Sequence, residues 1–228
     1  MAKKCFPPAT LSFLNELAQN NNRAWFNENK SRYEADVLDP ALAFIEAMVQ
    51  PLAKMAPNFT AIPKRVGGSL MRVYRDTRFS PNKQPYKTNI GMQFRHKIGK
   101  DVHAPGYYVH IDPDEVFLGV GVWHPEKNTL AGIRERIAEK PDEWKKIMRG
   151  RRFNRYFSLA GESLKRPPRG FDPEDAFIDD IKRKDFIAVR NLDHALLTTP
   201  EFHREVVASF KSADPFMRFL CASININL

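Results

Sequence analysis

Residues 107–123 read Tyr-Tyr-Val-His-Ile-Asp-Pro-Asp-Glu-Val-Phe-Leu-Gly-Val-Gly-Val-Trp and carry the clearest fold signal in the chain. Apolar residues alternate with other residues on both sides of the segment 112–115, Asp-Pro-Asp-Glu, which has turn composition. This pattern is typical of two half-buried strands. We therefore expect an antiparallel hairpin with strands over 107–112 and 116–123.

The same alternation extends the sheet to earlier and later segments. It predicts strands over 70–74 and 90–96, and a further strand over 186–190. Apolar residues at helical spacing precede this region, and prolines at plausible first helical positions follow it. The sequence predicts an α+β fold with a central, mainly antiparallel sheet of four to five strands flanked by N-terminal and C-terminal helices.

The length of 228 residues and a hydrophobic fraction of 43% are typical of one globular domain. We expect a single domain over 1–228, with helices over 10–55, a sheet core over 68–123, and helices and one possible strand over 125–223. Within the first part, Thr10 and Asn22 are placed to cap helices. Pro40 interrupts a helical pattern and predicts a kink or a restart.

Alternation also predicts what each face of the sheet carries. One face is apolar and is expected to pack against helices. The other face is polar and aromatic, and its strand over 116–123 holds Gly119 and Gly121, a residue type that often marks a close approach in a strand. We interpret this face as the floor of a pocket. The alternative is that a helix or the N-terminal segment covers it.

Residues 72–88 form the most basic local sequence, with five cationic side chains against one carboxylate, Asp76. Aromatic residues separate the charges, and Pro81 and Pro85 restrict the backbone. Arginine pairs oxyanions with two parallel hydrogen bonds, so the segment is expected to form an ordered loop that binds an anion. The alternative is internal pairing of these cations with Asp76 and with acids of the helices. The predicted ligand-binding residues are Arg72, Arg75, Arg78, Lys83, Tyr86, Lys87, Thr88 and Tyr108.

Evidence for catalysis is weaker. His110 is the best general acid–base candidate and Asp76 the best carboxylate. The residues His103, His110, Asp112 and His124 match no zinc spacing, and Gly119-Val120-Gly121 lacks the third glycine of a dinucleotide site. We expect no metal and no cofactor, and the sequence leaves open whether the protein is an enzyme.

The net charge of +9 is concentrated in two segments. Residues 63–105 carry ten Lys/Arg against two Asp/Glu, and residues 145–170 carry nine against one. Local positive fields attract phosphates. Our first hypothesis is a small phosphate- or carboxylate-bearing ligand, the second is nucleic acid bound by both segments, and the third is a non-enzymatic structural or interaction domain.

Several longer motifs resemble one known family. They are Asn21–Lys30, Tyr74–Ser80 with Lys83, Pro85–Thr88, Gly106–Tyr108 and Gly119–Pro125. In this order and spacing they are similar to domain-of-unknown-function family 2461, across nearly the whole chain. Asn82, Gln84 and His124 depart from the residues expected at those positions, without altering the basic loop. The resemblance implies a single cytoplasmic domain and supplies no catalytic residues.

The location inferred from the residues themselves agrees with this. Cys5 and Cys221 lie near opposite ends and form no disulfide framework, which favours a reducing cytoplasm. The N-terminal residues lack an apolar signal region, and no segment approaches the length of a membrane span. We expect no membrane partner, and the sequence does not indicate an oligomeric state.

Overall fold

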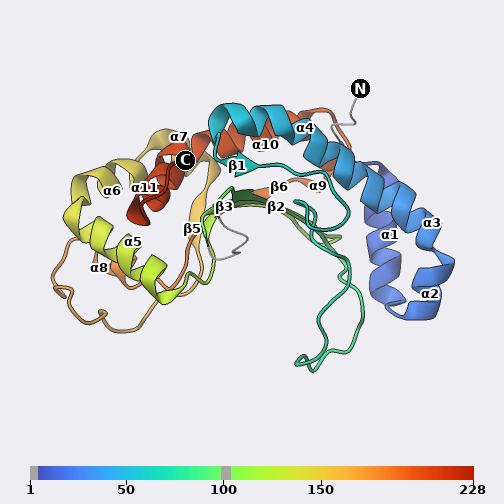
Figure 1. Cartoon of the computed structure of the whole chain (residues 1–228), viewed down its shortest axis with the longest axis horizontal. Coiled ribbons are helices and arrows are strands. Elements are labelled where there is room, and N and C mark those ends of the chain that lie inside the picture. Colours follow the sequence, from blue (N-terminus) through green and yellow to red (C-terminus); the bar gives the residue numbers. More distant parts are fainter. Residues whose placement is uncertain (1–4, 99–103) are drawn as a thin grey trace.

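A six-stranded antiparallel sheet forms the centre of the protein (Figure 1). The computed structural model describes residues 5–98 and 104–228. The strand order is β1-β2-β3-β4-β6-β5. The strands are β1 Phe59–Thr60, β2 Ile90–His96, β3 Gly106–Ile111, β4 Val116–Val122, β5 Ser158–Ala160 and β6 Phe186–Leu192. The α+β prediction is confirmed, and the hairpin expected over 107–123 is the pair β3–β4.

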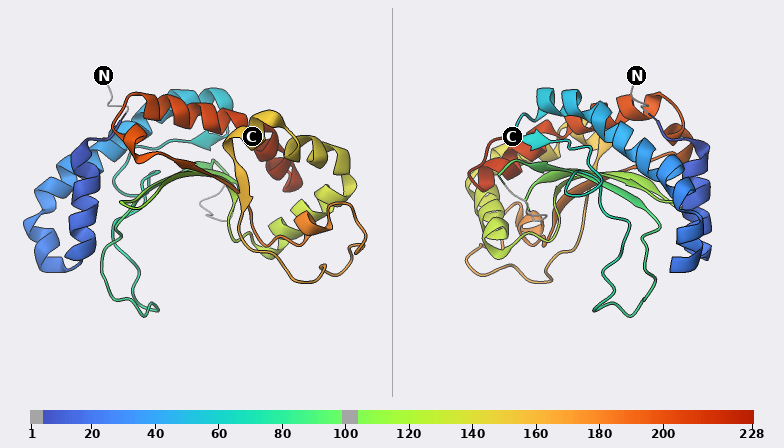
Figure 2. Two further views of the ribbon diagram at one scale, coloured as in Figure 1. Left: turned by 180° about the vertical axis from the view of Figure 1, so that it is seen from behind. Right: turned by 45° about the vertical axis from the view of Figure 1, so that its right-hand side comes forward.

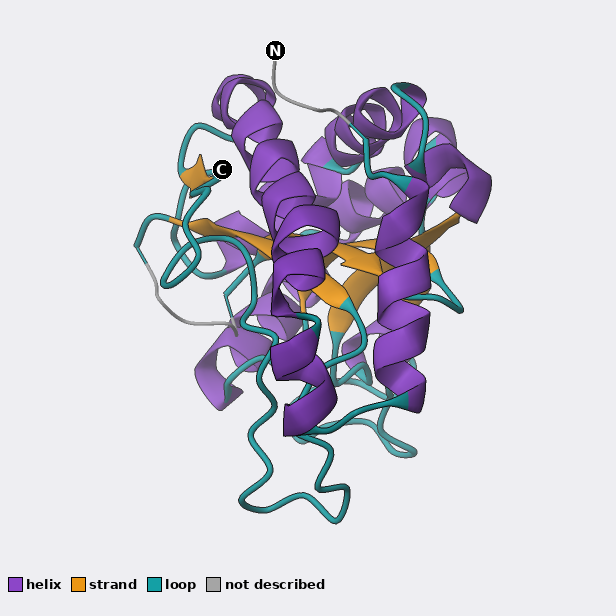
Figure 3. Ribbon diagram, turned by 90° about the vertical axis from the view of Figure 1, so that its right-hand side faces the viewer, coloured by secondary structure: helices purple, strands orange, loops and turns teal. Residues whose placement is uncertain are grey.

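Helices lie above the sheet and at its two ends (Figures 1 and 2). The first group is α1 Pro8–Gln19, α2 Arg23–Glu28, α3 Lys30–Tyr33, a π-helical turn η1 Glu34–Leu38, and α4 Asp39–Met55. The second is α5 Lys127–Glu139, α6 Pro141–Met148, α7 Arg151–Tyr156, α8 Ile178–Ile181, α9 His194–Leu197, α10 Glu201–Ser212 and α11 Asp214–Ser223. Helices α4, α10 and α11 cover one face of the arched sheet, as the side view in Figure 3 also shows.

The covered face is the apolar face predicted from alternation. Met92, Val109 and Leu118 on the three central strands are completely buried. Aromatic side chains of the helices pack onto it, with the rings of Phe210 and Tyr107 at a centroid distance of 4.9 Å. Full burial of a large apolar side chain stabilises a fold by about 1.5–3 kcal/mol, so this layer is the main source of stability.

The prediction of a strand over Leu70–Tyr74 is wrong. Leu70 and Tyr74 form only isolated bridges, with Met92 and Tyr86 respectively. Proline lacks the backbone donor that a regular ladder needs, and Pro85 lies in the opposing segment. Two short strands that were not predicted, β1 and β5, extend the sheet at its edges and bring the number of strands to six.

Of the three helix boundary features predicted from the sequence, two are confirmed. The Asn22 side chain accepts a hydrogen bond from the Trp25 amide at 3.0 Å, which confirms the predicted cap of α2. The cap predicted at Thr10 is wrong, because α1 already begins at Pro8 and the buried Thr10 hydroxyl donates to the carbonyl of Asp36 in η1. The interruption expected at Pro40 is confirmed by η1, which ends directly before α4.

The concave face of the sheet has no helix directly over it among residues 5–98 and 104–228 (Figures 1 and 2). Helices α1–α3 flank this face at one end and α5 and α8 flank it at the other, while the loop over residues 61–89 projects from the same side. Within these described ranges, every helix is too short or too polar to cross a lipid bilayer.

Candidate functional site

The predicted basic loop folds back on itself as an irregular hairpin. Its two arms are joined by backbone hydrogen bonds from Lys87 to Val73 (2.7 Å) and from Arg75 to Pro85 (2.9 Å). These bonds satisfy the backbone of the arms without a regular strand. The base of the loop is therefore ordered, and its tip, residues 76–84, projects away from the sheet (Figure 1).

Contacts with the N-terminal helices hold the base of the loop. The Asn21 amide donates to the Tyr86 carbonyl at 3.0 Å and accepts from the Tyr86 amide at 3.1 Å. The ring of Phe26 stacks on the ring of Tyr86, with centroids 4.0 Å apart and planes at 16°. Two motifs far apart in the sequence, residues 21–30 and 74–88, are thus one packed unit.

The tip makes contacts within itself. Arg78 binds the Asp76 carboxylate through two side-chain hydrogen bonds of 3.0 and 2.7 Å. This guanidinium lowers the pKa of Asp76 to about 2. Lys83 donates to the carbonyl of Thr77 at 3.0 Å, while Phe79 is 93% exposed. Two of the predicted ligand-binding cations therefore already have partners in the loop.

A cavity of about 310 Å³ lies between α2 and the base of the loop. Its lining residues come from both segments and are Arg23, Asn27, Tyr74, Arg75, Thr77, Pro85 and Tyr86. In the part of the chain that the structure describes, neither Arg23 nor Arg75 forms an ion pair. Arg23 acts electrostatically on the Tyr86 hydroxyl, whose pKa burial raises. Of the predicted ligand-binding residues, this cavity unites Arg75 and Tyr86.

The other predicted residues lie outside this cavity. Arg72 is exposed, and its charge contributes to lowering the pKa of Asp76 and of Lys87. Burial is the larger cause for Lys87, which is half-buried. Thr88 is half-buried beside it, and Tyr108 is in β3 on the concave face of the sheet.

On the concave face, Tyr108 and His110 form a hydrogen-bonded pair. The Tyr108 hydroxyl lies 3.0 Å from Nδ1 of His110, and the imidazole stacks on Phe117 with centroids 4.5 Å apart. Burial raises the pKa of Tyr108 to about 12 and lowers the pKa of His110. Both side chains are therefore neutral at pH 7, and the proton of the hydrogen bond stays on the Tyr108 hydroxyl because the two pKa values are shifted apart. His110 and the other catalytic candidate, Asp76, do not share a site, because Asp76 is in the loop tip.

The glycines of this face have two different explanations. A Cβ at Gly119 would meet Tyr108 at an ordinary contact distance of 3.6 Å. A Cβ at Gly121 would lie 2.1 Å from the carbonyl oxygen of Phe186, and its φ of 113° is rare for other residues. Backbone geometry therefore accounts for Gly121 without an approaching ligand.

No cluster of three or more metal-binding side chains occurs in residues 5–98 and 104–228. His103 lies outside the described residues. His124 lies 3.2 Å from the buried carboxylate of Asp185, which also accepts hydrogen bonds from the amides of His124 and Glu162. This histidine therefore belongs to a structural network at the end of β4.

Sequence reasoning missed Arg23 and Asn27. They are four residues apart on α2, so they lie on the same side of a helix. The motif Asn21–Lys30 and this spacing were the available signals, but neither reveals that the helix packs against a loop about fifty residues later.

A comparison with protein families finds a match that covers the motifs at this cavity. The family model described as conserved hypothetical protein (DUF2461) matches residues 9–219. The comparisons with curated proteins and with solved structures gave no match. The matched range includes every residue that lines the cavity. The chain therefore belongs to the DUF2461 family of conserved hypothetical proteins.

Proposed function

We propose that the protein binds a small ligand with a phosphate or carboxylate group in the cavity between α2 and the basic loop. The observation that carries this proposal is the presence of Arg23 and Arg75 in one cavity, with no ion pair within the described residues. Two guanidinium groups that line one cavity repel each other, and an anion bound between them would offset this repulsion. An anionic group is therefore the ligand chemistry that the cavity favours.

The remaining lining residues suit such a ligand. Asn27, Thr77 and the tyrosines Tyr74 and Tyr86 supply neutral hydrogen-bonding groups and aromatic surface. The volume of about 310 Å³ lies at the lower end of the range for small-molecule sites. Each charge-assisted hydrogen bond contributes about 1.5–3 kcal/mol, so loss of one arginine should weaken binding about 10- to 150-fold.

The two alternatives have less support. Internal pairing accounts for Arg78, through Asp76, but leaves Arg23 and Arg75 without an acidic partner in the described structure. Nucleic acid binding by both basic segments needs a continuous cationic track. The loop projects from the concave side of the sheet, whereas α6 and α7, from the second segment, pack near α11 on the other side (Figure 1).

The test is isothermal titration calorimetry with phosphate, citrate and sugar phosphates. Binding of one of these anions should weaken at least tenfold in Arg75→Ala and in Arg23→Ala. Lys30→Ala removes a nearby positive charge from α3 without altering the lining, so it serves as the matched control. An unchanged affinity in both arginine variants, or binding only of oligonucleotides with a steep salt dependence, would refute the proposal.

We also infer a cytoplasmic location. Cys5 and Cys221 are both free thiols in the structure, which supports a reducing compartment. Fractionation of cells that produce the native protein tests this location directly, and recovery outside the cytoplasmic fraction would contradict it.

A further inference from the structure

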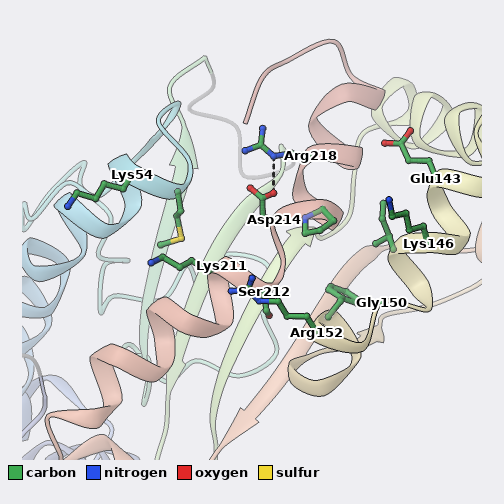
Figure 4. A pocket seen from close by; sticks show the side chains of 13 residues that line it. Lys54, Glu143, Lys146, Gly150, Arg152, Lys211, Ser212, Asp214 and Arg218 are labelled. Atoms are coloured by element: carbon green, nitrogen blue, oxygen red, sulfur yellow. Dashed lines mark hydrogen bonds and ion pairs between the residues drawn. The ribbon is translucent and has the colours of Figure 1, made fainter.

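A second and larger cavity lies on the helical side of the sheet. It has a volume of about 830 Å³ and lies where the end of α4, the helices α6 and α7, and the α10–α11 junction meet (Figure 4). The lining residues are Lys54, Met55, Glu143, Lys146, Ile147, Gly150, Arg152, Phe153, Lys211, Ser212, Asp214, Pro215 and Arg218. None of these residues lines the cavity beside the basic loop.

The cationic side chains of this cavity exceed its acidic ones, five to two. Both acids already have cationic partners, because Glu143 binds Arg136 at 3.0 Å and Asp214 binds Arg218 at 2.9 Å. The other four cations, Lys54, Lys146, Arg152 and Lys211, form no ion pair within residues 5–98 and 104–228. In Figure 4, Arg152 extends from α7 toward the α10–α11 junction, while Lys54 points outward from α4.

The charged rim surrounds apolar surface. Met55 is half-buried and Pro215 is exposed, and both supply apolar surface to the lining, whereas Ile147 and Phe153 beside them are already nearly completely buried. A simple inorganic anion would use the rim and leave this surface in contact with water. A ligand with an apolar or aromatic part would remove it from water, at a gain of roughly 25 cal/mol per Å².

We propose that this cavity binds a small organic phosphate whose body is aromatic or apolar. A phosphate monoester carries a charge of about −1.5 to −2 at pH 7, and several phosphates match several unpaired cations. The volume lies within the range of small-molecule sites, and such sites combine apolar lining with a few polar groups. The concave shape and the accessible apolar part of the lining favour a compact ligand over a nucleic acid strand.

The test uses ATP as the probe, with adenosine and tripolyphosphate as its separate halves. ATP should bind at least tenfold more tightly than either half. The double variant Lys146→Ala/Arg152→Ala should weaken ATP binding at least tenfold. Lys145→Ala/Arg151→Ala removes the same charge from neighbouring exposed positions of α6 and α7 that do not line the cavity, and should change the affinity less than twofold.

Calorimetry of all variants is repeated in an Arg75→Ala background, which separates this cavity from the one beside the loop. The expected effects persist there. The proposal is overturned if ATP does not bind, if the two double variants weaken it equally, or if tripolyphosphate binds as tightly as ATP. It is also overturned if a dT10 oligonucleotide displaces ATP with a steep dependence on salt, because that result identifies a surface for nucleic acid.

Discussion

Asn21 is expected to control both the stability of the loop and the binding of the proposed anion. Its amide makes two hydrogen bonds, of 3.0 and 3.1 Å, with the backbone of Tyr86. A hydrogen bond contributes about 0.5–1.5 kcal/mol net, so Asn21→Ala should reduce the free energy of unfolding by about 1–3 kcal/mol. In a chain of this size each kcal/mol lowers Tm by about 2–4 °C, which gives a decrease of about 2–12 °C.

The variant Asn21→Asp tests the two hydrogen bonds separately, because it keeps the acceptor and removes the donor. At pH 7 an aspartate retains the acceptor for the Tyr86 amide but places a negative oxygen beside the Tyr86 carbonyl, where the amide donated. It should therefore destabilise the protein at least as much as Asn21→Ala does. Asn82→Ala, at the exposed loop tip, is the control. It also removes two hydrogen bonds, both with Gln84, but water replaces them at this exposed position, so the stability should remain within about 0.5 kcal/mol of the wild type.

The measurements are urea denaturation followed by fluorescence and calorimetric titration of the anion. Weaker anion binding is expected in both Asn21 variants, because Tyr86 and Arg75 are held by the same base of the loop. Wild-type stability in Asn21→Ala would show that the stacking of Phe26 on Tyr86 suffices to hold the loop. Higher stability in Asn21→Asp than in Asn21→Ala would refute the hydrogen-bond argument.

Three further predictions concern single groups. Gly121→Ala should reduce the free energy of unfolding by more than about 3 kcal/mol, because its Cβ would lie 2.1 Å from a carbonyl oxygen of β6. Gly119→Ala should reduce it by less than about 1 kcal/mol. Equal reductions in denaturation experiments would contradict this. Iodoacetamide should modify Cys5 but not Cys221 in the native protein, as seen by mass spectrometry, because burial raises the pKa of Cys221 to about 12. NMR titration should give Asp76 a pKa of about 2, rising toward 3.8 in Arg78→Ala. Since the pKa of Asp76 is lowered in the folded state, the ion pair stabilises the fold at pH values above the ordinary pKa, and this stabilisation is lost as pH falls toward 2. A pKa of Asp76 that is unchanged by Arg78→Ala would exclude the pair in solution.

Strands with strict alternation were predictable because each has one completely buried face. The prediction for 90–96 matches β2 at both ends, and 116–123 exceeds β4 by one residue. Strands β1 and β5 have two and three residues, too few for a period of two to show. Residues 70–74 alternate as well, but Leu70 bridges Met92 of β2 whereas Tyr74 bridges Tyr86 beside Pro85, so the segment changes partner and forms only isolated bridges.

The candidate site was partly predictable for a related reason. Local composition identified the basic loop with Arg75 and Tyr86, since charge, aromatic residues and proline are visible in one short segment. The contribution of α2 was not visible, because Arg23 meets the loop only through tertiary packing. The pairing of Arg78 with Asp76 also depends on a turn geometry that spacing alone does not fix.

The π-helical turn η1 determines how far α2 and α3 are rotated about the helix axis relative to α4. A π turn contains one residue more than the α-helical turn it replaces, and one residue corresponds to a rotation of about 100°. Deleting one residue within Glu34–Leu38 would turn α2 and α3 about the helix axis while α4 stays fixed by the core. Arg23 would then leave the cavity that it shares with Arg75. A single inserted residue, outside the lining of the cavity, thus determines whether Arg23 and Arg75 line the same cavity.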